Sequence, residues 1–330
     1  MKVSIVIACK KFNPYLRECL KYCLELKYPD FEIFVLPDEK FAYNNPKVKI
    51  ITTGPISPPM KRNKVLGLAR GELFAFLDDD AYPEEDWLGV AVNYFENPDI
   101  AAIGGPAITP PTDSLAQIAS GMIYESVLVS DGFTYRYRTG KLREVDDYPS
   151  CNFIIRRDAF DTVLGGFKTN FWPGEDTFLC LEITKKLRKK ILYVPELIVF
   201  HHRRSLFRAH LRQISNYALH RGYFAKRFPE TSLRLSYFIP SLFVLFILIP
   251  GVLFWFFHPL RFPYFLCVFF YLSVVGWNSL FYHRHQYLNH CNHSKSKLTF
   301  LIFSGIIITH LSYGVYFLKG LFARKMREEQ

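Results

Sequence analysis

The stretch FLDDDAYPEEDWL, residues 76–88, joins a short apolar run to three consecutive aspartates. The run ELFAFL, residues 72–77, has the length and the apolar residues of a buried strand. Adjacent carboxylates repel one another and are costly to take out of water. Asp78, Asp79 and Asp80 therefore belong where water or a cation reaches them. The stretch predicts a buried strand that ends at a charged edge of a sheet.

Strand-like and helix-like segments alternate over the first two hundred residues. Strands are expected at residues 2–8, 31–36, 47–52 and 72–77, and helices at residues 13–26 and 63–69. Short strands separated by helices predict a mostly parallel sheet with both faces covered. Such sheets bind ligands where their strands end. Asp38 follows one strand and the three aspartates follow another, so we expect these acids to lie at one crevice.

The composition is basic and strongly apolar. Of 330 residues half are hydrophobic, and the formal net charge is +11. In a soluble protein this charge would indicate a nucleic acid partner. Here the basic residues stand beside long apolar segments, which favours an anionic membrane surface or a diphosphate substrate as partner. We therefore expect membrane lipids and no nucleic acid.

The cysteines and the N-terminus bear on the cellular compartment. The seven cysteines form no CxxC pair and no Cys/His spacing suited to zinc. An odd number without a disulfide framework indicates a reducing compartment. The opening MKVSIVIACK is too short an apolar run for a signal peptide. These features predict that the N-terminal region works in the cytoplasm.

Three uncharged apolar segments follow, at residues 235–257, 264–282 and 298–318. Each is long enough to cross the roughly 30 Å of hydrocarbon in a bilayer. Buried helices of a soluble domain are the alternative, which three such segments close together make less favourable. The arginine-rich segment before the first span favours the cytoplasm. The basic tail at residues 319–330 conflicts with three crossings, so the topology stays open. We expect an integral protein of the inner or plasma membrane.

An arginine-rich helix is expected at residues 205–230, between the two regions. Leu211, Ile214 and Ala218 lie on one helical stripe with Phe207, and arginines occupy much of the remaining surface. Such a helix can lie on anionic lipid, or it can pack on the catalytic domain as an ordinary amphipathic helix. We favour the interfacial position.

The acid cluster suits a hard divalent cation. Mg²⁺ and Mn²⁺ take carboxylate and phosphate oxygens and rarely need a full protein cage. Such an ion would neutralise a diphosphate and stabilise it as a leaving group. A run of three aspartates is by itself a weak signal, because acidic turns are common and usually just solvated. The surrounding motifs strengthen it.

Several segments, read together, resemble a family 2 glycosyltransferase. They are VSIVIACKKFNPYLRECL, GPISPPMKRNKVLGLARGELFAFLDDDAYPEEDWL, PSCNFIIRRDAFDTVLGGF, WPGEDTFLCLEITKKL and VFHHRRS. The resemblance covers residues 1–205. It implies the GT-A fold, a Rossmann-like mixed sheet, over residues 1–204. It also implies transfer of a sugar from a nucleotide-diphosphate donor with inversion, dependence on Mn²⁺ or Mg²⁺, and, as in membrane-anchored members, a lipid-linked acceptor.

The resemblance also implies residue roles. It places Asp38 at the nucleotide base and Asp79 near the ribose, and it makes Asp80 the metal ligand, with Asp78 beside it and His201 or His202 completing the coordination. Asn152 stands in a loop that usually carries glycines, where this chain has Ser150 and Cys151. The donor-binding residues implied are Ala8, Asp38, Lys61, Arg62, Asp78, Asp79, Asn152, Arg203 and Arg204.

Asp176, in the sequence GED at the start of a predicted helix, is the expected catalytic base. Inverting transfer needs a carboxylate that takes the proton from the attacking hydroxyl. A helix N-terminus favours the charged form of an acid in its first turn. A simple capping residue is the alternative for Asp176. Glu175 is expected to support the base as a hydrogen-bond acceptor.

The sequence thus predicts a membrane-bound, metal-dependent, inverting glycosyltransferase. Its expected acceptor is a polyprenyl-diphosphate-linked saccharide in polysaccharide or glycan synthesis. One alternative is a membrane scaffold that binds a nucleotide sugar without catalysis, although the intact DDD and GED motifs speak against it. Another is a channel or transporter, which the lack of charge inside the apolar segments disfavours.

Overall fold

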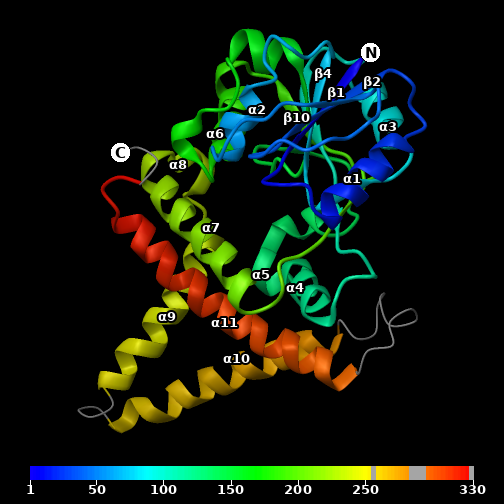
Figure 1. Ribbon diagram of the computed structural model, residues 1–330. Coiled ribbons are helices and arrows are strands. Elements are labelled where there is room, and N and C mark those ends of the chain that lie inside the picture. The colour runs from blue at the N-terminus through cyan, green and yellow to red at the C-terminus, as the bar shows by residue number, and fades with distance from the viewer. Residues whose placement is uncertain (254–257, 282–294, 327–330) are drawn as a thin grey trace. The chain divides into compact units, whose positions relative to one another are not determined.

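The computed structural model describes residues 1–253, 258–281 and 295–326, and these form two compact units (Figure 1). The sheet unit comprises Met1–Ile108 and Tyr135–His202. The helical unit comprises Thr109–Thr134 and Arg203–Met326. The helical unit therefore includes a segment from the middle of the region expected as one catalytic domain, residues 1–204.

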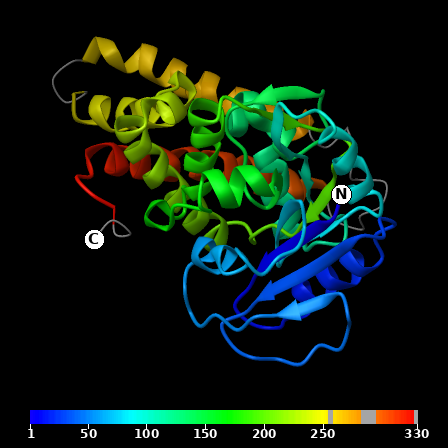
Figure 2. The ribbon, with the colours of Figure 1, turned by 90° about the horizontal axis from the view of Figure 1, so that it is seen from above.

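A mixed sheet forms the centre of the sheet unit. Within the described residues its strand order is β3-β2-β1-β4-β9-β6-β10-β8. The strands are β1 (Val3–Ala8), β2 (Phe31–Leu36), β3 (Val48–Ile50), β4 (Leu73–Asp78), β6 (Ile100–Gly104), β8 (Arg143–Val145), β9 (Asn152–Arg156) and β10 (Lys190–Tyr193). The first four are parallel, and the blue N-terminal strands lie side by side in Figure 2. Strand β9 runs antiparallel between β4 and β6. The predicted mixed α/β fold is confirmed.

The register of the central strands brings their carboxyl ends level. Ala8, the last residue of β1, pairs with Leu36 on one side and with Asp78 on the other. Asp38 and Asp78 consequently lie at the same edge of the sheet. A second sheet, β5 (Ala81–Pro83), β11 (Val199–His201) and β7 (Ala107–Ile108), begins directly after the aspartates.

Helix α1 (Pro14–Leu24) buries the stripe expected from its spacing: Leu16, Cys19, Leu20 and Cys23. Asn13 caps it, because its side chain accepts a hydrogen bond from Leu16 N at 2.9 Å. The helix expected at residues 63–69 was wrong. Helix α2 instead spans Pro58–Asn63, since proline suits the first turn of a helix. Turns follow it up to Gly67, which has a φ of +78°.

The sheet unit is completed by shorter helical segments. They are α3 (Trp87–Tyr94), η2 (Asp158–Val163), η3 (Thr169–Phe171), α6 (Glu175–Leu181) and η4 (Glu182–Lys186). The core of the unit packs α1 and α3 against the sheet around the fully buried Trp87. Segment η1 (Asp131–Arg136) leads into this unit from the helical one.

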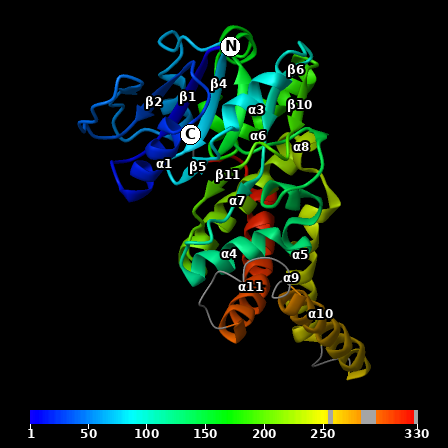
Figure 3. The ribbon, with the colours of Figure 1, turned by 90° about the vertical axis from the view of Figure 1, so that its right-hand side faces the viewer.

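Helix α11 is the axis of the helical unit, and Figure 3 shows the other helices of the unit around it. The helices are α4 (Leu115–Glu125), α5 (Val127–Ser130), α7 (Arg208–Arg227), α8 (Pro229–Ser232), α9 (Leu235–Leu253), η5 (His258–Leu260), α10 (Arg261–Phe281) and α11 (Lys295–Phe322). Ile118, Met122 and Ile123 of α4 share a core with Ile302 and Ile306 of α11. This shared core explains why residues 109–134 belong with the C-terminal helices.

Glycines allow α7 and α11 to pack closely. A Cβ on Gly222 would lie 2.0 Å from Phe317 O, and one on Gly320 would lie 1.9 Å from Leu219 O. Ile214 and Ala218, from the apolar stripe of α7, are buried, and Ala218 clusters with Phe317 of α11. Part of the stripe expected to meet lipid is therefore covered by protein.

Among the residues that the structure describes, two helices are long and apolar enough to cross a membrane, His258–Phe281 and Lys295–Phe322. They contain all but residue 282 of the spans expected at residues 264–282 and 298–318. The apolar part of helix α9, Leu235–Ile249, is shorter than these two helices. Residues 254–257 of the first expected span, residue 282 and residues 327–330 of the expected tail lie outside the described residues.

Candidate active site

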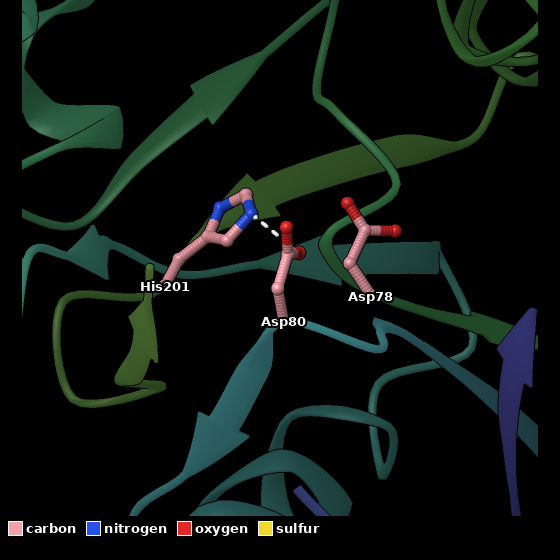
Figure 4. Close-up of side chains that lie close together, drawn as sticks. All are labelled: Asp78, Asp80 and His201. Carbon is pink, nitrogen blue, oxygen red and sulfur yellow. Dashed lines mark hydrogen bonds and ion pairs between the residues drawn. The ribbon is translucent and has the colours of Figure 1, made fainter. Parts of the chain in front are cut away.

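Two carboxylates and an imidazole converge just past the end of β4. One ligand atom each from Asp78, Asp80 and His201 lie within 4.8 Å of one another (Figure 4). Asp80 stands in the turn between β4 and β5, and β11 pairs antiparallel with β5 so that His201 opposes Ala81. This pairing brings a histidine from the far end of the chain onto the aspartate turn.

The electrostatics of this cluster are governed by Asp80 and His201. Nε2 of His201 lies 3.1 Å from Asp80 Oδ1. Burial by itself lowers the pKa of His201, but the Asp80 carboxylate outweighs burial and raises the pKa to about 10. Two carboxylate oxygens and one imidazole nitrogen are a donor set that suits Mn²⁺, with oxygen donors that also suit Mg²⁺.

His202, the alternative to His201 as a metal ligand, does not join this cluster. Its Nε2 lies 2.8 Å from Glu18 Oε2 on α1, and its ring is tilted by 38° against the Tyr15 ring at a centroid distance of 4.5 Å. Strand β11 ends at His201, and the ring of His202, the next residue, is held by α1 instead of by the aspartates. The metal assignment of His202 is therefore not supported by its position.

The residues expected around the nucleotide base also come together. Lys61 Nζ donates hydrogen bonds to Asp38 Oδ1 and to Cys9 O, the residue after Ala8. Asp38 N donates to Lys10 O at 2.9 Å, which ties the two strand ends together. Asn13 Nδ2 donates to Asp79 Oδ2 at 3.4 Å. Asn13 was not among the predicted site residues, although its place before a helix-starting proline marks it as a cap.

Arg62 is buried among acids. Its guanidinium donates to Asp78 Oδ1 at 2.9 Å, to Ser150 Oγ at 2.9 Å and to Glu175 Oε1 at 3.4 Å. Only 4% of its side chain is exposed. Arg62 was expected to bind the donor, but its hydrogen bonds are made within the protein.

Asn152 is fully buried at the start of β9. Its Nδ2 donates to Leu197 O at 2.7 Å and to Gly105 O at 2.8 Å, and its Oδ1 accepts from Trp87 Nε1 at 3.0 Å. Buried amides need such partners. The predicted contact of Asn152 with the donor does not fit this position, because its amide holds the fold together.

Asp176 and Glu175 begin α6. Asp176 Oδ1 accepts from Thr177 N at 2.8 Å, and Oδ2 accepts from Ser150 N at 3.3 Å. Burial raises the pKa of Glu175 to about 8, the Asp176 carboxylate adds to the rise, and Arg62 opposes it. Glu175 therefore keeps its proton to a higher pH than an ordinary glutamate does.

The two remaining predicted donor residues belong to the helical unit. Arg203 Nε donates to Thr109 Oγ1 at 3.2 Å, and its guanidinium carbon lies 5.8 Å from the centre of the Tyr124 ring. Arg203 is buried, whereas Arg204 is exposed. The contacts of Arg203 hold residues 109–134 to the start of the C-terminal region.

The mixed sheet has the GT-A fold expected from the sequence. Residues 4–164 match the family model of Glycosyl transferase family 2. The resemblance found in the sequence is thereby confirmed, and this stretch is a family 2 glycosyltransferase domain. The match ends before Asp176 and His201, so the roles of those residues stay predictions.

Characterised relatives are distant. The glucosyl-dolichyl phosphate glucuronosyltransferase of Haloferax volcanii is 24% identical over 221 residues, which are 61% of this chain and 69% of the relative. The dolichyl N-acetyl-alpha-D-glucosaminyl phosphate 3-beta-D-2,3-diacetamido-2,3-dideoxy-beta-D-glucuronosyltransferase of Methanococcus voltae is 23% identical over 241 residues, 67% of this chain and 73% of the relative.

A solved structure shares the fold. The mannosyltransferase PcManGT of Pyrobaculum calidifontis, in complex with GDP-Man and Mn²⁺, superposes with a TM-score of 0.54 at 16% identity. The superposition covers 98% of this chain and 88% of that one. At this identity the likeness is one of fold alone.

Proposed function

We propose that this glycosyltransferase is membrane-bound, metal-dependent and inverting, and that it transfers a sugar from a nucleotide-diphosphate donor to a lipid-linked saccharide. The observation that carries the proposal is the convergence of Asp78, Asp80 and His201 at the strand ends of a family 2 domain. The predicted base Asp176 lies in the same unit.

Asp80, Asp78 and His201 would hold Mn²⁺ or Mg²⁺. An ion on three protein atoms keeps coordination positions open for phosphate oxygens. When bound, it would neutralise the diphosphate of the leaving nucleotide. The fold relative from Pyrobaculum calidifontis was solved with GDP-Man and Mn²⁺, which agrees with this assignment. Asp38, Lys61, Asp79 and the strand end at Ala8 would hold the nucleotide.

Asp176 is the proposed base. Two backbone amides fix its carboxylate oxygens, those of Thr177 and Ser150. Glu175 beside it, with a pKa raised to about 8 by burial, leaves Asp176 as the ionised member of the pair near neutral pH. A charged carboxylate in a fixed orientation can accept the proton of the acceptor hydroxyl as that oxygen attacks. Attack opposite to the leaving diphosphate inverts the anomeric carbon.

The acceptor is proposed to be a polyprenyl-phosphate- or polyprenyl-diphosphate-linked saccharide. Both archaeal relatives are named for dolichyl phosphate-linked sugars. Helices α10 and α11 are apolar enough to lie in a bilayer, and exposed Arg208 and Arg212 of α7 suit anionic headgroups. The sheet unit would face the cytoplasm, where nucleotide sugars are made.

A thermal-stability assay tests the donor site. The detergent-purified protein is melted with UDP, GDP or dTDP, each with and without Mn²⁺. A nucleotide at about a hundred times its Kd should stabilise the protein by roughly 2.7 kcal/mol. We expect one nucleotide to stabilise only with Mn²⁺, and Asp80→Ala to remove the effect. No stabilisation by any nucleotide, with or without Mn²⁺, would contradict the proposal.

A transfer assay tests the acceptor. The sugar nucleotide of the stabilising base is offered with a polyprenyl-diphosphate-linked saccharide or with the same saccharide free in solution. We expect transfer to the lipid-linked form alone. Equal turnover on the free sugar would leave the glycosyltransferase standing and remove the lipid from its acceptor.

A further inference from the structure

A continuous chain of hydrogen bonds joins the metal-side carboxylate Asp78 to the predicted base Asp176. Arg62 donates to Asp78 Oδ1 and to Ser150 Oγ, both at 2.9 Å. Ser150 N in turn donates to Asp176 Oδ2 at 3.3 Å. The four residues come from α2, β4, the loop before β9 and α6, and they lie in one unit.

Arg62 is built into this position. Its guanidinium lies 5.6 Å from the centre of the Phe167 ring and 5.9 Å from that of Phe76. A third hydrogen bond, to Glu175 at 3.4 Å, occupies the same nitrogen that reaches Ser150. The planar fork of arginine can engage several oxygens in fixed directions, which the point charge of lysine cannot. The buried fork therefore sets where Ser150 lies relative to Asp78.

Ser150 takes part in this chain through two different atoms, its hydroxyl and its backbone amide. Glycine could donate its backbone amide to Asp176, but it has no hydroxyl that accepts from Arg62. In this protein the hydroxyl ties the amide donor of the base to the arginine that holds the metal-side acid.

We propose that Arg62 and Ser150 are positioning residues that fix the orientation of Asp176 relative to the metal-binding edge. The inference rests on the proposed roles of Asp78 and Asp176. It reassigns Arg62 from donor binding to the alignment of two catalytic groups. The two residues act through their neighbours and contact neither substrate nor metal.

The first test needs no substrate. Hydrogen exchange is measured by mass spectrometry on the peptide that contains residue 150, in the metal-free protein. We expect Ser150→Ala and Arg62→Lys to speed exchange of this amide about tenfold, the effect of losing one hydrogen bond to a charged group. Ser4→Ala is the matched control. Fully buried Ser4 also bonds a carboxylate, Glu32 Oε1 at 2.8 Å, but it lies away from the site. Wild-type exchange in both site variants would overturn the proposal.

The second test separates positioning from stability. With the donor found in the nucleotide screen, we expect Ser150→Ala to lower kcat about tenfold with an unchanged donor KM. The acid limb of its pH–rate profile should move to higher pH, because Asp176 loses an ordered donor. Ser150→Thr keeps the hydroxyl and should restore most of kcat. A positioning role would be refuted if Ser4→Ala and Ser150→Ala lost activity in the same proportion to their loss of melting temperature.

The two proposals can fail separately. If Asp176→Asn keeps full turnover, the base assignment fails, while the exchange experiment still reports whether Arg62 orders the Ser150 amide. If Asp176→Asn is inactive and Ser150→Ala behaves as wild type in kcat, pH profile and exchange, the base stands and the positioning chain is refuted.

Discussion

The two units place polar groups differently. The sheet unit gathers charge at one edge, where buried Arg62 pairs with Asp78 and buried Lys61 pairs with Asp38. The middle of α11 in the helical unit instead makes uncharged hydrogen bonds, Thr309 with His210, Ser312 with Ser215 and the Gly314 carbonyl with Ser241. Uncharged bonds between helices are what a segment in hydrocarbon tolerates. Charge is thus concentrated where chemistry is proposed, whereas the helix proposed to meet lipid carries its lysines, Lys295, Lys297 and Lys319, near its ends.

The largest expected effect comes from removing the proposed base. Asp176→Asn keeps the size of the side chain and one acceptor oxygen but cannot take a proton. We expect transfer to fall by about 10³-fold, within the range for general base catalysis. Nucleotide-induced stabilisation should stay normal, because Asp176 is not among the proposed donor contacts. Asp161→Asn is the control, since Asp161 pairs with Arg157 on the surface of the same unit. Turnover close to wild type would remove Asp176 from the mechanism.

Asn152 tests whether a buried polar group of the sheet unit serves stability or donor binding. Asn152→Ala removes the hydrogen bonds from Nδ2 to Gly105 O and Leu197 O and takes the Oδ1 acceptor away from the buried Trp87 indole. We expect a loss of about 3 kcal/mol in the free energy of unfolding, measured by denaturant titration. Nucleotide affinity of the molecules that remain folded should be unchanged. A stable variant with weakened nucleotide binding would restore the donor role predicted from sequence.

Much of the sheet unit was predictable because its central strands β1, β2 and β4 are largely buried apolar runs. Residues 31–36 match β2, the strand expected at residues 2–8 begins one residue before β1, and the one expected at residues 72–77 is shifted by one residue from β4. The meeting of Asp38 and Asp78 at one edge follows from parallel pairing alone. The positions of buried strands and their parallel direction can both be predicted from the local pattern of apolar residues.

The rest depended on contacts between distant segments. Whether His201 or His202 faces Asp80 is decided by the pairing of β11 with β5, which no local pattern contains. The burial of Asn152 depends on β9 lying between two other strands. The apolar face of residues 115–125 suits a sheet or a helix as partner equally well, so its packing on α11 could not be foreseen.

A glycine tests the packing of the helical unit. Gly320→Ala would place a Cβ 1.9 Å from Leu219 O on α7, and backbone cannot yield as a side chain would. We expect a loss of about 2 kcal/mol of stability from overpacking, measured as a lowered melting temperature in detergent. Gly276→Ala on α10 is the matched control, because its nearest neighbour lies at an ordinary 3.8 Å. Equal melting of the two variants would contradict the close approach of α7 and α11.

The smallest expected effects are two pH dependences of opposite sign. Glu175 has a folded-state pKa raised from 4.5 to about 8 by burial and by Asp176. Its contribution to stability is therefore present below pH 4.5 and is lost as the pH rises toward 8. His210 has a pKa lowered from 6.5 to about 4 by burial. Its contribution is present above pH 6.5 and is lost as the pH falls toward 4.

Each dependence can be isolated by a neutral variant. As the pH rises from 5 to 8, the melting temperature of wild type should fall relative to that of Glu175→Gln. As the pH falls from 6.5 to 4, the melting temperature of wild type should fall relative to that of His210→Gln. The reason is that burial opposes protonation of the His210 ring, which lies between Ser120 and Thr309. If both melting-temperature differences changed with pH in the same direction, one of the two side chains would not be buried in its neutral form. The contrast between the charged edge of the sheet unit and the neutral hydrogen bonds in the middle of α11 would then fail at that residue.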